Sequence, residues 1–500
     1  MRRLVVLTLA LFLLSPPDRA FAHGLGQTYD LPIPFWLYFF SASAAVLISF
    51  VQIGLFVDEG HDMRRYPRFD LLRIEPLRAL LTARPFLFGL RLLSVALFLL
   101  VILSGLLGRQ APSSNFAPTF VWITWWVGFS FFTAFVGNVW PLVNPWKTLF
   151  EWADALVRRL GAEGGLELRE PYQTSFLGIW PALAFYSVFV WTELVFQGRT
   201  EPYNIALLAL FYSGVTWGGM IIFGKEAWLR RGEAFSVFFG LLGRFAPTEV
   251  RVTDPKLCVD CSSRCQTLEG ECVGCYECFA RATPKDRELN LRPPSVGLAR
   301  PEAVPPGGVF FVIFVLAGVA YDGLKETPPW LGLVRLTPIT PTLGLFLLPL
   351  FFLAVYLGFV KLSQLLGGGA GPLGRFAAAY VYSLVPIAIA YQVAHYFSYL
   401  LIQGQAIVGL LSDPLGWGWD LFGTAGHQIN PNIIGADTVW HSQVALIVSG
   451  HVIAVYLAHL VALRLLKDRR RALLSQLPIL ALMILYTVFS LWILSQPITR

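Results

Sequence analysis

The chain has 500 residues, of which 56% are hydrophobic and only 14% are charged. It contains 40 Phe and 16 Trp. This balance lies far outside the range of soluble domains and predicts an all-α membrane protein that crosses the bilayer many times.

The N-terminal residues have the pattern of a secretory signal. Two arginines precede an apolar run from Leu4 to Leu14, and Ala20-Phe21-Ala22 has the small-x-small form of a cleavage site. An apolar core this short cannot span a bilayer. The sequence therefore predicts a signal peptide over residues 1–22 and His23 as the first mature residue.

The rest of the chain contains about ten apolar segments, each long enough to cross ~30 Å of hydrocarbon. We expect five transmembrane helices within residues 23–224 and five more within 308–500. Residues 233–246 are too short to span, and we expect them to lie along the membrane interface. The predicted spans lie near 34–56, 87–107, 119–140, 176–196, 203–223, 308–323, 338–360, 377–403, 440–466 and 474–497.

The positive charges set the expected orientation. With the mature N-terminus outside, 30 of the 38 Lys and Arg residues fall on the inner side and five on the outer side. Basic loops stay in the cytoplasm, so both mature ends are predicted to be periplasmic, at a bacterial inner membrane. The net charge of +7 reflects this orientation. We therefore expect the lipid bilayer as a partner, and no nucleic acid.

All six cysteines fall within 21 residues of the predicted cytoplasmic loop 225–307. The cytoplasm is reducing, so a disulfide framework is disfavoured and metal binding is expected. Pairs of cysteines separated by two residues can reach one ion from a tight turn, which Gly270 and Gly274 permit. The predicted ligands are Cys258, Cys261, Cys265, Cys272, Cys275 and Cys278.

The stretches CVDC and ECVGCYEC resemble the two-cluster ferredoxin segment of membrane redox proteins. That segment has eight cysteines and this chain has six. Arg264 and Ala282 stand where further ligands would fall. The resemblance therefore implies at most one 4Fe-4S cluster, and a zinc ion is the alternative.

Several histidines and carboxylates fall in or near the outer half of the predicted helices. Asp437 and His441 are four residues apart and share a helix face. His451 is ~15 Å further along the same helix, so it needs a partner from another helix, and His395 is at comparable depth. Intramembrane ionisable residues are expensive and usually functional. If His395 and His451 pair, they could ligate a catalytic metal or a b-type haem.

Three further features belong to the predicted outer side. An N-terminal His23 offers its amine and its ring to one copper ion. Asp322 and Glu193 lie near outer helix ends and could serve as a base or a ligand. The outer loop 404–438 has acidic and imidazole groups but no Lys or Arg, which suits a divalent metal or the entrance of a neutral substrate.

Over most of its length the chain resembles bacterial membrane proteins of the fenitrothion hydrolase type. The stretches that carry the resemblance are AHGLGQTYDLPIPFWLYFF, NVWPLVNPWKTL, AYDGLKETPPW, AYQVAHYFSYLLIQGQ and LLSDPLGWGWDLFGTAG. The resemblance implies hydrolysis of aryl organophosphorothioate esters, which are apolar small molecules. An outer zinc or copper ion could activate water for this reaction.

For that ion we expect ligands among His395, Asp437, His441 and His451, with Asp322 or Glu193 as the base. Two other functions stay open. One is a redox or copper-handling protein with an iron–sulfur or zinc cysteine site and histidine-bound haem or copper. The other is a transporter. The sequence also leaves open a second membrane subunit.

Overall fold

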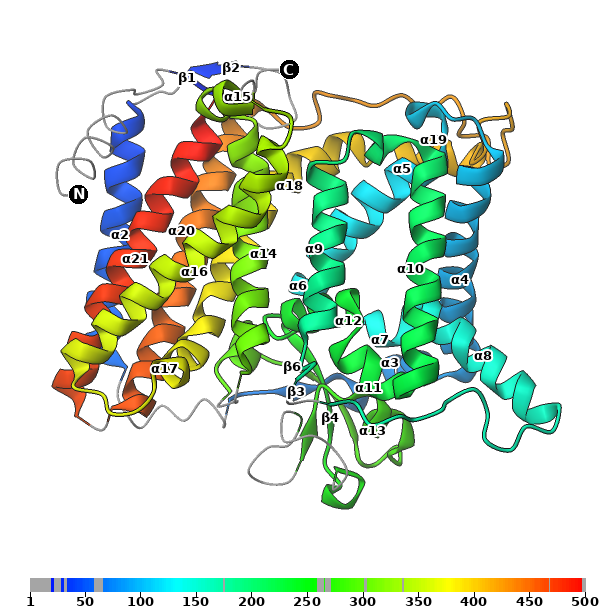
Figure 1. Cartoon of the computed structure of the whole chain (residues 1–500), viewed down its shortest axis with the longest axis horizontal. Coiled ribbons are helices and arrows are strands. Elements are labelled where there is room, and N and C mark those ends of the chain that lie inside the picture. The colour runs from blue at the N-terminus through cyan, green and yellow to red at the C-terminus, as the bar shows by residue number, and fades with distance from the viewer. Residues whose placement is uncertain are drawn as a thin grey trace. The chain divides into compact units, whose positions relative to one another are not determined.

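The computed structural model is mainly helical and divides into two compact units (Figure 1). Unit 1 comprises residues 1–61, 312–402 and 430–500, and unit 2 comprises residues 62–311 and 403–429. Most of the predicted signal peptide, His23 and Cys261 lie outside the described residues. The structure describes residues 19–21, 28–30, 34–57, 66–173, 176–258, 265, 271–300, 304–334, 337–466 and 468–496.

Eight helices in the described part of the chain are long and apolar enough to cross a membrane, which confirms the all-α membrane fold. Each has the length of about 20 residues or more that ~30 Å of hydrocarbon requires. These spans are α2 (Phe35–Phe56), α4 (Arg84–Leu107), α10 (Pro202–Phe223), α14 (Pro306–Lys325), α16 (Thr340–Gly367), the run Leu373–Gln403, α20 (Ala436–Leu465) and α21 (Arg469–Ser495).

The other two predicted spans are built differently. The predicted span 176–196 is the 15-residue helix α9 (Trp180–Leu194). The predicted span 119–140 begins as a π-helix, η3 (Thr119–Phe129), between α5 (Phe116–Pro118) and α6 (Ser130–Phe135). An 11-residue π-helix is unusual, because this form is mostly confined to single turns and occurs often at functional sites.

Unit 1 is a bundle in which α20 and α21 pack against each other and against α2, and α21 also packs against α16 (Figure 1). The run Leu373–Gln403 consists of α17 (Leu373–Tyr380), η7 (Val381–Leu384) and α18 (Val385–Gln403). Gly450 of α20 permits a close helix crossing, because a Cβ there would lie 2.4 Å from the Cβ of Ala390. The remaining elements are β1 (Arg19–Phe21), β2 (Thr28–Asp30) and α15 (Pro328–Val334).

In unit 2 the short helix α12 (Ala234–Gly243) differs from the expectation of an interfacial helix. Phe235, Phe238 and Phe239 are buried, and the Glu233 carboxylate caps the helix by accepting from two backbone N–H groups. Aromatic neighbours on α9 and η3 surround it, so it belongs to the core.

The other helical elements are η1 (Leu71–Arg73), α3 (Glu75–Leu81), η2 (Pro112–Ser114), α7 (Trp140–Val143), α8 (Pro145–Arg159), η4 (Gln197–Thr200), α11 (Lys225–Arg231), η5 (Pro255–Cys258), α13 (Tyr276–Arg281), η6 (Val296–Leu298) and α19 (Ala406–Ser412).

Three strands of the predicted cysteine loop join β3, from residues before α4, in an antiparallel sheet with the order β3-β6-β4-β5. Its strands are β3 (Phe69–Asp70), β4 (Thr248–Val252), β5 (Cys272–Val273) and β6 (Arg287–Leu291). A buried ion network holds it together, since Glu249 contacts Arg251 at 2.9 Å and Arg300 at 3.1 Å and also pairs with Arg292. Burial opposes ionisation of Glu249, but these arginines outweigh it and lower the pKa of the carboxyl.

Candidate metal centre and neighbouring cavity

Three of the predicted cysteine ligands come together in unit 2. The sulfur atoms of Cys265, Cys272 and Cys275 all lie within 4.8 Å of one another. Among the described residues, this is the one group of three His, Cys, Asp or Glu side chains whose donor atoms lie that close. These three sulfurs therefore form a donor set that could hold a metal ion.

The local backbone explains why the sulfurs converge. Cys272 lies on β5, opposite Val252 of β4, and Cys275 is the N-cap residue of α13. The turn between them needs a left-handed residue, which Gly274 supplies with φ +75°. The Gly274 N–H donates to the Val250 carbonyl at 2.8 Å, and the Val273 N–H donates to the Cys265 carbonyl at 2.8 Å.

The electrostatics of the group favour one thiolate. Hydrogen bonds from Cys265 and Cys272 hold the pKa of the Cys275 thiol below its usual value. The Arg230 guanidinium lies 3.9 Å from the Cys275 sulfur and also pairs with Glu277 at 3.0 Å. A nearby cation and a deprotonated thiol are the conditions under which cysteine binds metals.

The sulfur spacing can be compared with known metal sites. Tetrahedral zinc with Zn–S bonds of about 2.3 Å places its sulfur ligands about 3.8 Å apart, within the 4.8 Å limit that holds for the three sulfurs here. In a 4Fe-4S cluster each cysteine binds a different iron, so the sulfurs must lie farther apart. Cys278 is also buried beside Cys272 and Cys275, while its thiol donates to the Leu257 carbonyl at 3.6 Å. A fourth ligand could come from Cys278, or from Cys258 or Cys261, whose side chains lie outside the described part.

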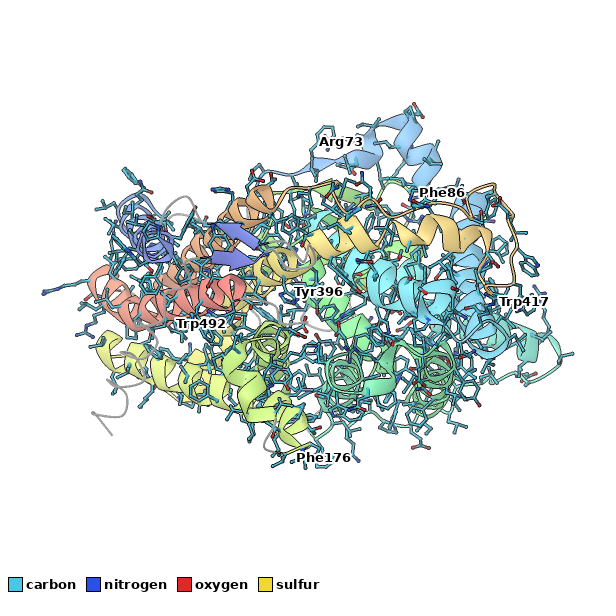
Figure 2. All side chains as sticks on the ribbon, turned by 90° about the horizontal axis from the view of Figure 1, so that it is seen from above. Arg73, Phe86, Phe176, Tyr396, Trp417 and Trp492 are labelled. Carbon is cyan, nitrogen blue, oxygen red and sulfur yellow. The ribbon has the colours of Figure 1, made fainter. Side chains whose placement is uncertain are left out.

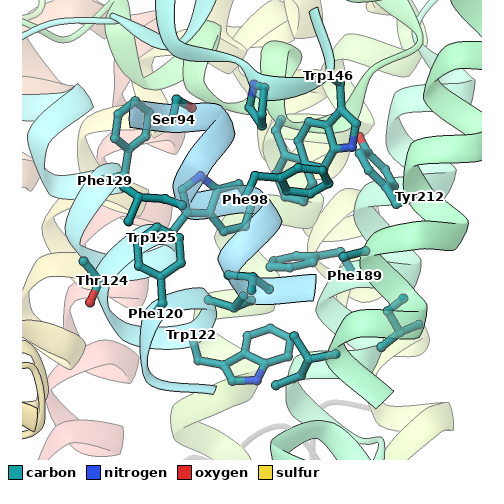
Figure 3. A pocket seen from close by; sticks show the side chains of 18 of the residues that line it. Ser94, Phe98, Phe120, Trp122, Thr124, Trp125, Phe129, Trp146, Phe189 and Tyr212 are labelled. Atoms are coloured by element: carbon teal, nitrogen blue, oxygen red, sulfur yellow. The ribbon is translucent and has the colours of Figure 1, made fainter. Parts of the chain in front are cut away.

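Unit 2 also contains a cavity of about 380 Å³ within its helices (Figure 3). Twelve of its 26 lining residues are aromatic, and the π-helix η3 contributes six of the 26. Leu93, Val188 and Phe211 line it and are also more than half exposed on the surface of unit 2, so the cavity reaches a lipid-facing side. The aromatic lining is Phe98, Phe120, Trp122, Trp125, Phe129, Trp140, Trp146, Phe185, Phe189, Phe211, Tyr212 and Phe235.

Several polar side chains of this wall already have partners in the protein. The Tyr212 hydroxyl donates to Glu233 at 2.5 Å, and the Trp146 indole donates to the Ser213 hydroxyl at 2.8 Å. Thr192 donates to the Val188 carbonyl at 2.9 Å and Ser94 to a backbone carbonyl. The wall therefore offers ring faces and aliphatic groups, which suit an apolar aromatic ligand.

A short series of contacts joins the cysteine group to this cavity. Tyr276 follows Cys275 directly, and its hydroxyl donates to the Asn138 carbonyl. The Asn138 side chain accepts from the Trp140 N–H at 3.1 Å, and the Trp140 ring lines the cavity. These hydrogen bonds link the residue after Cys275 to the backbone of a residue in the cavity wall.

In unit 1 the structure brings together two residues that the sequence analysis had given separate roles. The His395 Nε2 lies 2.7 Å from Asp322 Oδ2, and both residues are buried. The Asp322 carboxylate also accepts from the Tyr396 hydroxyl at 2.5 Å and pairs with Lys325 at 2.9 Å. The Asp322 carboxylate therefore has three polar or charged partners on two helices.

The remaining predicted outer ligands do not gather. Asp437 and His441 are exposed, and the His441 ring contacts the Asp437 backbone carbonyl at 2.8 Å. His451 is fully buried, and its Nδ1 lies 2.8 Å from the Ile447 carbonyl. Within the described residues, these groups and His395 form no set of three donors within 4.8 Å. The outer metal ion stays a prediction.

The polar groups of the predicted outer loop and Glu193 take part in local contacts. Asp413 accepts from the backbone N–H groups of Trp417 and Gly418, and Trp417 points outward at the edge of the molecule (Figure 2). His427 is exposed. Glu193, the other predicted base, accepts from the Trp126 indole at 2.7 Å.

The cavity was not among the features predicted from the sequence. The signal available was the run TFVWITWWVGFSFF over residues 119–132, which has seven aromatic residues and no charge. The same run also has the pattern of a transmembrane span, which is the prediction made for residues 119–140.

Comparisons with protein-family models, curated proteins and solved structures find no match. The chain is a multi-pass, all-α membrane protein with a cysteine group that could bind a metal ion.

Proposed function

We propose that this chain is a membrane transport protein that takes an apolar aromatic molecule from the bilayer into the cavity of unit 2. The observation that carries the proposal is the aromatic-lined cavity of about 380 Å³, which a drug-sized apolar molecule fits. Phe211 and Val188 line the cavity and are also exposed on the surface of unit 2, so a molecule dissolved in lipid can enter the cavity beside them.

The composition of the wall favours binding over chemistry. The lining includes no carboxylate, histidine or cysteine, and its hydroxyls belong to Ser94, Thr124, Thr192 and Tyr212. A hydrolytic step needs a general base or a metal-bound water beside the substrate. A ligand held here has neither in contact with it, so it would leave unchanged.

We assign the cysteine group to one zinc ion. Its role in this proposal is structural, because closing a small, loop-rich region around a metal supplies folding free energy. Through Tyr276 and Asn138, that ion would fix the position of Trp140 in the cavity wall.

Transport is tested in liposomes that contain the purified protein and a lipophilic aromatic dye that fluoresces only in lipid. With an imposed proton gradient, active extrusion lowers the fluorescence, and Ala209→Phe, which fills the cavity, abolishes the change. Leu207→Phe, on the exposed side of the same helix, is the matched control. No fluorescence change in the wild type, or an equal change in both variants, would contradict the proposal.

A second candidate, hydrolysis of aryl organophosphorothioate esters, is favoured by one observation. The buried Asp322–His395 pair has the form of a carboxylate orienting an imidazole base. The same vesicles given a nitrophenyl phosphorothioate ester distinguish the two candidates. Release of coloured nitrophenolate that Asp322→Asn abolishes would establish the hydrolase, whereas we expect the ester to bind and remain intact.

A further inference from the structure

We propose that unit 1 contains a gated proton pathway, an activity separate from ligand binding by unit 2. Its outer part consists of Asp322, His395, Tyr391, Tyr486 and His451, and its inner part is His459. One apolar residue, Val455, separates the two parts. The observations that support each part come from α14, α18, α20 and α21 of unit 1.

The outer part is a continuous row of titratable groups. It starts one turn before the end of α14, where Asp322 contacts Lys325 and His395. The His395 and Tyr391 rings stack with centroids 6.2 Å apart and 14° between their planes. A Cβ at Gly323 would lie 2.7 Å from the Tyr391 hydroxyl, so this glycine leaves room for that hydroxyl next to Asp322.

The row then crosses to the last two helices. The Tyr391 and Tyr486 rings are 6.4 Å apart, and the Tyr486 and His451 rings are 6.0 Å apart. These three residues are buried. These values join ring centroids, and no hydrogen bond joins the polar atoms of these rings, because the Tyr486 hydroxyl donates to the Leu316 carbonyl at 3.4 Å. A single bridging water joins two polar atoms about 5.5 Å apart.

Buried polar atoms along the row need partners. The Tyr391 hydroxyl and the His451 Nε2 have no hydrogen-bond partner among the described residues. Each such atom costs roughly 1–3 kcal/mol if it stays unsatisfied, and internal water is the usual partner. Water between hydroxyl and imidazole groups is also the medium through which protons move.

The inner part begins further along α20. The His459 ring lies 3.0 Å from the Gln476 side chain and 3.1 Å from the Val57 carbonyl, which follows the end of α2. His451, Val455 and His459 are spaced four residues apart, so they lie on one face of α20, about 6 Å apart along the axis. Val455 is buried and cannot carry a proton.

Proton movement along this row needs no redox partner. Each group or water accepts a proton on one atom and releases another proton to its neighbour, so charge moves and no group is consumed. Val455 stops this sequence between the two histidines. A pathway that is interrupted at rest prevents a leak and lets a conformational change control the flux.

The test measures proton flux into liposomes that contain the full chain, an internal pH-sensitive dye and a potassium ionophore. We expect wild-type flux close to that of empty vesicles. Val455→His places a third imidazole between His451 and His459 and raises the flux about tenfold or more. Val455→Asn, which has a smaller side chain, serves as a second opening variant, and Val455→Leu leaves the flux unchanged.

Second substitutions show whether the proposed row carries the flux. In the Val455→His protein, Tyr391→Phe or His451→Gln returns the flux to the wild-type level. Tyr356→Phe is the matched control, because this buried hydroxyl donates to the Ala377 carbonyl and lies outside the row. The pathway would be overturned if the wild-type protein itself showed a high proton flux. It would also be overturned if the Val455 variants were as thermally stable as the wild type but showed no increase in proton flux, or if Tyr391→Phe did not lower the flux of the Val455→His protein. Dye binding by unit 2 should be unchanged in all these proteins. Failure of the proton pathway can therefore be distinguished from failure of the proposed ligand site.

Discussion

Gly274 holds the turn that brings Cys272 and Cys275 together. Its φ of +75° is unfavourable for any residue with a Cβ, although no atom would collide with one. Alanine at such a position costs about 1–2 kcal/mol, so we expect Gly274→Ala to weaken zinc binding about tenfold. Competition with a chelating dye measures this change. Gly240→Ala on α12 also meets no atom and should leave zinc affinity unaltered.

The cysteines themselves give a second prediction at this scale. Cys265→Ser, Cys272→Ser and Cys275→Ser each remove one of three convergent sulfurs, and we expect each to reduce bound zinc from one equivalent to nearly none. Elemental analysis of purified protein measures the content. Visible absorption in the wild type, together with bound iron, would contradict the zinc assignment and favour the redox alternative.

Spacing in the sequence predicted the cysteine group because residues a few positions apart are brought together by local turns. Asp322 and His395 were predicted as functional one by one, but not as a pair. They are 73 residues apart, and only helix packing brings them within hydrogen-bonding distance. The partners of His451 depend in the same way on where α21 places Tyr486.

At the scale of elements, the small sheet depends on the buried network around Glu249. Removing its charge leaves Arg251 and Arg292 buried with fewer partners, and such losses cost about 3–5 kcal/mol. Glu249→Gln should therefore lower the thermal stability of the cysteine region and release zinc at a lower temperature. Limited proteolysis followed with temperature measures this.

The network also gives the sheet a pH dependence. The pKa of Glu249 is lower in the folded protein than in the unfolded chain. The ionised carboxylate therefore contributes fully to folding stability at pH values above the pKa that Glu249 has in the unfolded chain. This contribution is lost as the pH falls through the folded pKa. We expect zinc retention to decrease on acidification in the wild type, beyond the direct competition of protons for the thiols. In Glu249→Gln that additional decrease should be absent.

Long apolar helices were predictable, because eight segments carry enough hydrophobic residues to span on their own. The sheet was not, because its strands are two to five residues long and β3 comes from residues more than 170 positions before β4. The burial of α12 was missed for a related reason. Its length excludes a span, but only the aromatic residues of α9 and η3 show that it is enclosed.

At the scale of the whole molecule, the metal centre and the cavity should be linked within unit 2. Tyr276 joins α13 to Asn138, which positions Trp140. We expect removal of zinc by a chelator to weaken ligand binding in the wild type. In Tyr276→Phe, which keeps the cysteines, zinc should stay bound while ligand affinity falls to the chelated level and no longer responds to the chelator. Equal affinity with and without zinc in the wild type would contradict this link.

The most direct test of the cavity as the ligand site is equilibrium binding of a nitroaromatic ester to the purified protein, followed by quenching of tryptophan fluorescence. Trp122, Trp125, Trp140 and Trp146 line the cavity and should report occupancy. We predict saturable quenching that Ala209→Phe weakens about tenfold or more and Leu207→Phe does not alter. Quenching that rises without saturation, or equally in all three proteins, would contradict the account.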